Sequence, residues 1–561
     1  MVKSQSFFGF TGGLIFLLII TLGISCGRKM TGDSAFKKKQ YAKAIKLYSK
    51  DLETVSGDTA SAALAFKIAE SYRNANRIVD AQRWYKEAIK YGMNDDAYFF
   101  YADMLKRSGK YYQAIDAFNE YIERPTADKT KANIAVLGCK LAMEWVNEPS
   151  TDYKVESVPE LNTEFSDYAP SFMGDKLVFT SHRKKSSGAV VYGWSGEKFS
   201  DFFIADLDGD GKPGPVTSFD RSNIINTKFN EGASAFTPDT SEIYFTRCGS
   251  DKQFEIQYCK IFRSRKKPDG TWDTPVLMQI FTDVDKHLTD VVLRDDTFNI
   301  GQPSISADGK FLYFATDIPG GYGGNDIYYC EKKLGMWGSP VNMGPEINTQ
   351  GDEMYPFKHS DGKFYFCSNG HIGMGGLDIF EAEQKGDEWQ IYNMKSPLNS
   401  GADDFGLVLR NDEILDESGY YVTRGFFTST RDGGVGGDDI YSFSMVKDAF
   451  YFLNVEVYDK VLQNETDPNS RVVDYSPLNN ATIEIYGDET LVERAVSGAD
   501  GKLKYKLRPN MEYKVLASKE GYLNKSEFVP PVNYSTEKNK IINVDVEIIM
   551  DKSFESGTFI T

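Results

Sequence analysis

The sequence predicts a multidomain protein with three parts in order: an α-helical solenoid, an all-β propeller of about five blades, and a small β-sandwich. Three observations predict this order. An alanine-and-aromatic pattern occurs three times near the N-terminus, a phrase centred on Asn recurs in the middle, and alternating apolar runs follow towards the C-terminus. The chain of 561 residues is long enough for about three to five domains. Its 41% of hydrophobic residues can fill several cores.

The charge balance and the histidine count disfavour two classes of function. The chain has 64 Lys and Arg against 81 Asp and Glu, a net charge of −17, whereas a nucleic-acid-binding protein needs a basic face. Its four histidines are scattered along the sequence, which disfavours a metal site or catalytic triad built on them. We therefore expect no nucleic acid among the partners, and an assembly protein rather than an enzyme.

Residues 1–25 have the features of a secretory signal. Lys3 precedes an apolar run from Leu14 to Leu22, which is short for a membrane span, and small residues follow before Cys26. This region resembles the signal of bacterial lipoproteins, whose mature chain begins at a lipid-modified cysteine. The resemblance implies lipidation of Cys26 and attachment to a membrane surface. An ordinary secretory peptide with an incidental cysteine, or an uncleaved anchor, would leave a similar pattern.

The residues after Cys26 and the other cysteines bear on the compartment. In some bacterial groups an acidic cluster after the lipidated cysteine marks export to the cell surface. Residues 27–29 contain no such cluster. We therefore expect the periplasmic face of the outer membrane, where disulfides are permitted. Cys248 and Cys259 flank a predicted hairpin and could pair, while no cysteine spacing indicates a zinc site. The remaining thiols are expected as small buried hydrophobic groups: Cys139, Cys330 and Cys367.

Residues 26–148 are predicted to form stacked helix pairs. Three segments place a small alanine one helical turn before an aromatic residue, at Ala44/Tyr48, Ala81/Tyr85 and Ala114/Phe118. The alanines recur at close to the roughly 34-residue tetratricopeptide period, so the region resembles three tetratricopeptide repeats followed by a closing helix. Such a solenoid exposes a groove suited to a partner's peptide or helix. A purely structural spacer is the alternative.

Residues 150–447 repeat a β pattern. The phrase Leu161-Asn162-Thr163 recurs at 225–227, 347–349 and 398–400, with a degraded copy at 298–300. In four copies an acid lies five residues after the Asn, and then come two strands joined by a turn: Asp167, Glu231, Glu353 and Asp404. Because the Asn and the acid recur once per repeat, hydrogen bonding between blades explains them better than a binding site does.

A third strand in the repeat follows a glycine-rich loop and opens with an acid, at Asp326, Asp378 and Asp439. Glycine reaches backbone angles closed to other residues, and the Asp can accept hydrogen bonds from loop amides. A tryptophan then marks a fourth strand, at Trp272, Trp337 and, more loosely, Trp389. Four short strands per repeat, five times over, indicate a β-propeller. The repeats resemble the TolB-like, WD-type propellers of bacterial envelope proteins.

One insert in the first blade suggests a cation. Asp206, Asp208 and Asp210 are followed by Gly211, which matches the start of a calcium-binding loop. Thr217 stands where such a loop needs a bidentate Glu. Calcium is therefore the only cofactor the sequence suggests, and a solvated acidic turn is the alternative.

Residues 448–550 alternate apolar and polar side chains, as strands with one buried face do. The Asp500-Gly501 turn, followed by Gly521-Tyr522, resembles the carboxypeptidase regulatory-like domain, a small immunoglobulin-like β-sandwich. That resemblance implies a spacer or docking module without peptidase activity. Residues 551–561 carry no pattern and are expected to be a flexible tail.

Taken together, the arrangement resembles the PorE-type envelope lipoproteins of the type IX secretion system. It implies a non-enzymatic scaffold at the outer membrane that binds envelope subunits of a secretion or gliding machinery. Members of that family usually end in an OmpA-like domain that grips peptidoglycan. The sequence stops at Thr561 without one, so contact with the cell wall is not expected.

Two other function classes remain open. The propeller face could bind a glycan or a peptide, as in a sensor lipoprotein. An enzyme is the third class, because TolB-like propellers accompany prolyl-oligopeptidase-type hydrolases. Those hydrolases need a Gly-x-Ser-x-Gly motif, and the string 193–196 has its glycine one place too early.

Overall fold

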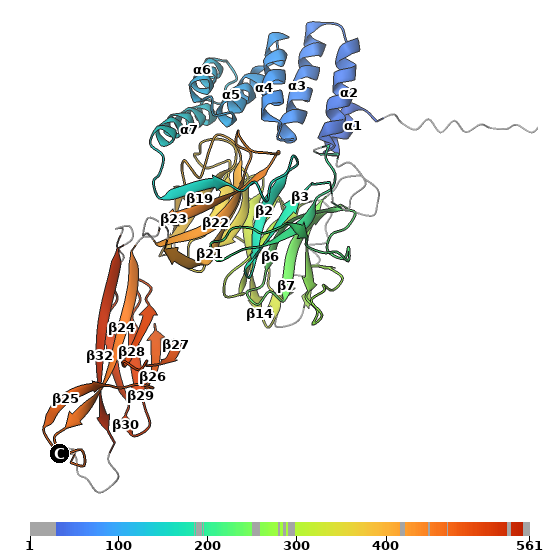
Figure 1. Ribbon diagram of the computed structural model, residues 1–561. Coiled ribbons are helices and arrows are strands. Elements are labelled where there is room, and N and C mark those ends of the chain that lie inside the picture. Colours follow the sequence, from blue (N-terminus) through green and yellow to red (C-terminus); the bar gives the residue numbers. More distant parts are fainter. Residues whose placement is uncertain are drawn as a thin grey trace, which may run out of the picture.

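The fold was analysed in a computed structural model. It describes residues 30–553, except for residue 185, residues 187–192, 195, 250–257, 279–280, 284–287, 290–297, 387, 416–420, 447–448, 468, 534 and 536–539. The chain forms an N-terminal helical repeat region, a five-bladed β-propeller and a C-terminal pair of β-sheets (Figure 1). The predicted multidomain fold class is thus confirmed.

Helices fold the first region into antiparallel layers: α1 (Gly32–Lys37), α2 (Tyr41–Thr54), α3 (Asp58–Asn74), α4 (Ile78–Lys90), α5 (Asp95–Arg107), α6 (Tyr111–Ile122) and α7 (Lys129–Asn147). The three predicted alanines are fully buried, and the aromatic residues one turn later are buried beside them. A residue with positive φ recurs in the turn before α2, α4 and α6, at Lys39, Asn76 and Gly109. The helical region therefore repeats in its turns as well as in its packing.

The propeller consists of five sheets whose first strands contact one another in a closed ring. The first two blades are β2 (Asp167–Met173), β3 (Lys176–Ser181), β4 (Asp201–Asp206), β5 (Thr217–Ser218), and β6 (Asn230–Phe236), β7 (Glu242–Cys248), β8 (Cys259–Arg265), β9 (Val276–Leu277). A short ladder, β10 (Phe281–Asp283) with β11 (Leu288–Thr289), lies before the third blade.

The other blades follow the same order from the axis outwards. The third is β12 (Ile300–Ile305), β13 (Phe311–Thr316), β14 (Asp326–Lys333), with β15 (Met336–Trp337) and β16 (Val341–Asn342). The fourth is β17 (Glu353–Lys358), β18 (Phe364–Ser368), β19 (Asp378–Lys385) and β20 (Glu388–Asn393). The fifth contains β21 (Asp404–Leu415), β22 (Tyr421–Ser429) and β23 (Asp439–Val446).

The fifth blade takes its outermost strand from the other end of the domain. Strand β1 (Tyr153–Ser157) pairs antiparallel with β23, which joins the two ends of the propeller sequence. Sequence analysis did not foresee this strand. Strand β1 completes the fifth blade and covers the edge of β23 that would otherwise be open.

The repeated asparagines connect neighbouring blades. In four of the five copies, the side-chain oxygen accepts from a backbone N–H, and the side-chain amide donates to the C=O of the same residue, in the third strand of the preceding blade. The distances are 2.7–3.0 Å, and the pairs are Asn162 with Ile440, Asn226 with Phe202, Asn348 with Ile327, and Asn399 with Ile379. The inter-blade hydrogen bonds expected from the sequence are therefore made by the asparagine side chains.

The side chains of the repeated acids act differently, because they bind their own turn. Each carboxylate is fully buried and accepts from the backbone N–H and hydroxyl of the Thr or Ser four residues earlier. An arginine then bridges the carboxylate to the C=O of the residue just before the Asn. This holds for Arg183 on Asp167, Arg247 on Glu231, and Arg431 on Asp404. In the fourth blade His371 takes the carbonyl contact.

The C-terminal region is two sheets that share one apolar core. Its strands are β24 (Phe450–Leu462), β25 (Val472–Pro477), β26 (Thr482–Gly487), β27 (Thr490–Val496), β28 (Lys502–Lys506), β29 (Tyr513–Ser518), β30 (Tyr522–Leu523), β31 (Lys525–Val529) and β32 (Ile541–Lys552). Strand β32 runs parallel to β24 and includes Asp551 and Lys552, which the sequence assigned to the tail. Ion pairs of Asp551 with Lys460 and of Lys552 with Asp459 accompany this longer strand.

The helical region packs against one face of the propeller (Figure 1). The Arg107 guanidinium binds both carboxylate oxygens of Asp403, at 2.8 and 2.9 Å, and Met374 of the propeller is buried in the helical core. The backbones also meet closely at glycines. A Cβ added at Gly401 would lie 2.7 Å from the Gly109 nitrogen, so no larger residue fits there.

Among the described residues, no helix is both long and apolar enough to cross a membrane. The predicted signal segment 1–25 and the expected lipidation site Cys26 lie outside those residues.

Candidate functional site

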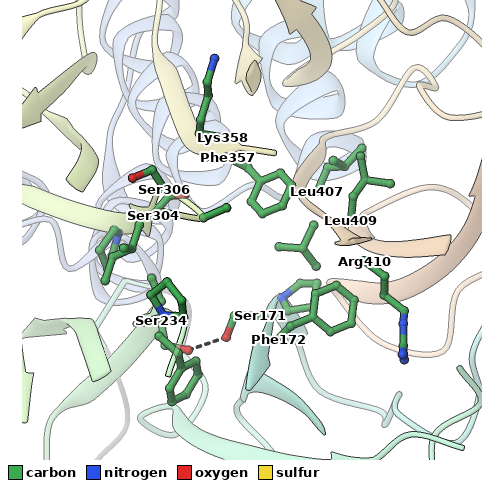
Figure 2. Close-up of a pocket in the computed structure, with 18 of the residues that line it drawn as sticks. Ser171, Phe172, Ser234, Ser304, Ser306, Phe357, Lys358, Leu407, Leu409 and Arg410 are labelled. Atoms are coloured by element: carbon green, nitrogen blue, oxygen red, sulfur yellow. Dashed lines mark hydrogen bonds between the residues drawn. The ribbon is translucent and has the colours of Figure 1, made fainter. Parts of the chain in front are cut away.

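The candidate site is a chamber of about 560 Å³ on the propeller axis. Its walls come from the first strand of every blade, namely β2, β6, β12, β17 and β21, and from the turns that follow those strands. Figure 2 looks into this chamber and shows side chains from all five blades around an open centre. This volume falls within the range of about 300–1,000 Å³ that is typical of small-molecule sites.

A β-bulge in every first strand shapes the chamber. One residue with positive φ stands two or three positions into each strand, and the pairing register shifts around it. These residues are Ala169, Ala233, Gln302, Tyr355 and Gly406. A bulge bends its strand and redirects the side chains that follow. Sequence analysis missed these bulges, since only Gly406 is a residue type that signals positive φ.

The wall differs in polarity from one side to the other (Figure 2). Ser171 and Ser234, from the first and second blades, share a hydrogen bond of 2.7 Å between their hydroxyl oxygens, and Ser304 extends this polar side into the third blade. Opposite them lie Phe357 and the leucines of β21, from the fourth and fifth blades. The hydroxyls of the chamber therefore gather on one side, where Phe172 also lies, and the opposite side is apolar.

The charged groups of the chamber lie at its mouth, where Arg410 pairs with carboxylates and Lys358 binds a backbone carbonyl. Arg410 binds Asp412 at 2.6 Å and approaches Asp175 at 3.6 Å, and the hydrogen bond from Arg410 lowers the pKa of Asp412. Lys358 donates to the C=O of Gly362. Burial lowers the pKa of the Lys358 amine. Within the described lining, Asp175 and Asp412 are the only carboxylates.

The chamber opens away from the helices. Its outer lining is formed by the turns between the first and second strands of the blades, such as 174–175 and 237–240. The helical region instead contacts loops at the opposite ends of those strands, through 193–194, 373–376 and 401–403. One end of the propeller axis is therefore covered by helices and the other end carries the mouth.

The predicted calcium ligands do not converge. Lys176 pairs with the Asp206 carboxylate, and Arg424 pairs with Asp210, while Asp208 accepts from the backbone N–H groups of its own turn. Asp206, Asp208 and Asp210 thus behave as the acidic turn that the sequence offered as the alternative to calcium. The part of the chain that the structure describes contains no group of three or more His, Cys, Asp or Glu that could hold a metal ion.

The remaining site residues of the sequence analysis are cysteines. Cys248 ends β7 and Cys259 begins β8, and a disulfide joins them. Cys139, Cys330 and Cys367 are buried free thiols. Burial raises the pKa of Cys139 to about 11 and that of Cys330 to about 12, so these thiols are unreactive at neutral pH.

Comparison with known proteins yields structural similarity alone. No family model and no curated protein matches the chain. A thermostable family-43 glycoside hydrolase matches with 14% identity over 50% of this chain and 90% of its own, with a TM-score of 0.31. A native arabinanase of Bacillus subtilis matches with 10% identity over 51% of this chain and 96% of its own, with a TM-score of 0.30. A family 117 glycoside hydrolase of Zobellia galactanivorans matches with 14% identity over 52% of this chain and 89% of its own, with a TM-score of 0.32. Activity does not follow from a likeness of this size.

Proposed function

We propose that the protein is a non-enzymatic scaffold lipoprotein on the periplasmic face of the outer membrane. In this proposal it binds envelope subunits of a type IX secretion or gliding machinery, as the resemblance to PorE-type lipoproteins implies. Lipidation of Cys26 anchors it, and protein surfaces rather than a reactive centre carry its function.

The observation that supports this proposal best is the docking of two repeat domains into one unit. The contact between Arg107 and Asp403 is mostly buried, and glycine backbones of the two domains touch. Repeat domains present broad surfaces for partners, and a fixed junction holds two such surfaces at a constant spacing. A platform that positions other subunits needs this constancy.

The chemistry of the chamber favours binding over catalysis. Both carboxylates of its described lining, Asp175 and Asp412, face Arg410. A hydrolase of sugars or peptides needs an acid and a base or nucleophile aimed at a common point. The pairing at the mouth leaves no such arrangement among the described lining residues.

The disulfide between Cys248 and Cys259 agrees with a location outside the cytoplasm. It complements the signal-like segment 1–25, which carries the lipidation hypothesis.

The helical region offers a specific surface for a partner. Val79 and Tyr112 are each 72% exposed, and they occupy equivalent positions, two residues before the repeated alanines of α4 and α6. The equivalent residue of α2, Ala42, lies against propeller residues Gly193 and Gly196. Two large apolar side chains in one row, next to a third position that is already a protein contact, indicate a docking edge.

Capture of partners from the native envelope tests this proposal. A tagged full-length chain, solubilised gently, should recover secretion or motor subunits, and the double variant Val79→Asp/Tyr112→Asp should recover at least tenfold less. Leu334→Asp is the matched control, because Leu334 is 76% exposed on a propeller turn far from that edge. Recovery of the bait alone, or equal capture by all three proteins, would refute the proposal.

A second candidate function is binding of a glycan or peptide by the propeller. The axial chamber favours it, since it is preformed and has the volume of a small-molecule site. A scaffold can also carry such a site, so the two functions are compatible.

A further inference from the structure

We infer that the axial chamber binds an uncharged saccharide of one or two rings. The inference rests on the second candidate function above and names its ligand class. Three features of the described lining carry it: its paired charges, its two-sided polarity, and the prolines in its strands.

The charges at the mouth disfavour an ionic ligand. The Arg410 charge is balanced by Asp412 and Asp175, although its buried Nη1 has no hydrogen-bond partner within the described structure. The Lys358 amine is hydrogen-bonded to the Gly362 carbonyl and lies 5.2 Å from the Trp389 ring centroid, and Figure 2 shows its side chain pointing away from the centre. Because the Arg410 charge is balanced and the Lys358 amine points away from the centre, an acidic sugar, a nucleotide or a metal complex would lose hydration in the chamber without meeting an unbalanced cation there.

The two-sided wall matches the two sides of a pyranose ring. Such a ring carries hydroxyl groups around its edge and C–H groups on its faces. The hydroxyls of Ser171, Ser234 and Ser304 can each donate and accept, and the Phe357 ring stands opposite them in Figure 2 with Leu407 and Leu409 beside it. Ser171 and Ser234 already bond each other, so a purely apolar ligand, such as an acyl chain, would leave only their remaining hydrogen-bonding capacity unused, whereas a sugar hydroxyl could use it.

The strand sequences disfavour an extended peptide. A peptide that adds to a strand edge relies on main-chain hydrogen bonds. Proline lacks the N–H that such a ladder needs, and Pro170, Pro303 and Pro356 follow the bulge residue in three of the five first strands. The chamber therefore offers side chains rather than backbone groups to its ligand.

Contacts between blades hold the chamber in this shape. The Thr428 hydroxyl accepts from the Ala169 N–H, and the Thr246 hydroxyl accepts from the Gln302 N–H, so these two bulges are tied to neighbouring blades. The Gln302 side-chain oxygen accepts from the Tyr355 N–H. A preformed wall lowers the ordering cost of binding.

Titration calorimetry on the purified mature chain tests the inference. The ligands are four neutral disaccharides, maltose, cellobiose, xylobiose and chitobiose, with digalacturonate as the anionic comparison and a neutral tripeptide as the peptide comparison. At least one neutral disaccharide should bind saturably, and Ser304→Ala and Phe357→Leu should each weaken that binding by about five- to tenfold. Leu334→Ala, on an exposed turn of the same domain, should bind as the parent does.

Three results would overturn the inference: no neutral disaccharide binds in the millimolar range, only the acidic sugar or the peptide binds, or both chamber variants bind as tightly as the parent. Thermal unfolding of each variant checks that it folds.

Partner capture measured on the same two variants separates the chamber inference from the scaffold proposal. Unchanged capture with no sugar binding removes the chamber inference alone, whereas sugar binding without any capture removes the scaffold.

Discussion

At the scale of single residues, the face of the propeller that meets the helices contains carboxyls buried away from water. Asp378 is the clearest case. One of its oxygens accepts from the Gly375 N–H at 3.2 Å, and the other has no partner within the described structure. Burial raises the pKa of Asp378 to about 8. Burial similarly raises the pKa of Glu231 to about 7 and that of Asp438 to about 6.

These shifts predict that stability falls as the pH rises. The folded state keeps its proton on Asp378 up to about pH 8, while the unfolded chain releases it near 3.8. The stabilisation that Asp378 contributes is therefore complete below its pKa in the unfolded chain and is lost as the pH rises through its pKa in the folded state. The loss is up to about 1.4 kcal/mol per pH unit. Asp378→Asn is neutral throughout and keeps an acceptor for Gly375, so its free energy of unfolding should fall less between pH 5 and pH 8. Denaturant titrations at both values measure this, and parallel losses in parent and variant would contradict it.

At the scale of elements, the repeated Asn side chains bind backbone groups in the third strand of the preceding blade and so join neighbouring blades. Removing one leaves a buried backbone N–H of the preceding blade without its partner, at a cost of about 1–3 kcal/mol. Asn226→Ala should therefore lower the free energy of unfolding by about 1–3 kcal/mol, because the Phe202 N–H loses its partner while the Phe202 C=O still accepts from the Phe219 N–H at 3.1 Å. Asn411→Ala, an exposed asparagine of the same domain, is the control and should change it by less than about 0.5 kcal/mol. Equal effects at both positions, measured by equilibrium unfolding, would disprove the idea that the Asn226 side chain stabilises the contact between blades.

The sequence predicted those elements whose signal is local. The Asn-centred motif and the Asp that opens each third strand recur as short sequence motifs. Asp326 and Asp439 do accept hydrogen bonds from their loop amides. The arginine partners of the buried acids were missed. Arg183 and Arg247 each follow their acid by 16 residues, but Arg431 follows Asp404 by 27, and the fourth blade has His371 at this carbonyl. Strand β1 was missed for a related reason, since its partner β23 lies at the other end of the domain.

The candidate site was even less visible in the sequence. The chamber forms only when five first strands converge on one axis, and no single strand carries a motif for it. Bulge positions occupied by alanine, glutamine and tyrosine give no local signal, because these residues seldom adopt positive φ. The calcium hypothesis remains a prediction from the spacing of Asp206, Asp208 and Asp210. In the structure, Lys176 on the neighbouring strand β3 pairs with Asp206, and Arg424 of the fifth blade pairs with Asp210.

At the scale of the whole molecule, the account depends on the junction between the helical region and the propeller. The helical region covers one end of the propeller axis, and the chamber opens at the other end, so the molecule has two separate surfaces for binding. The docking edge of Val79 and Tyr112 continues the row that already holds Ala42 against the propeller. A partner bound there would sit beside the junction, on the side of the propeller opposite the chamber mouth.

Chemical crosslinking in intact cells, followed by capture of the tagged protein and mass spectrometry, tests this account most directly. We expect crosslinks to one or a few envelope proteins, concentrated on the lysines near the docking edge, such as Lys86 and Lys110, and few at the chamber mouth. Crosslinks confined to the chain itself, or spread evenly over unrelated abundant proteins, would contradict the scaffold.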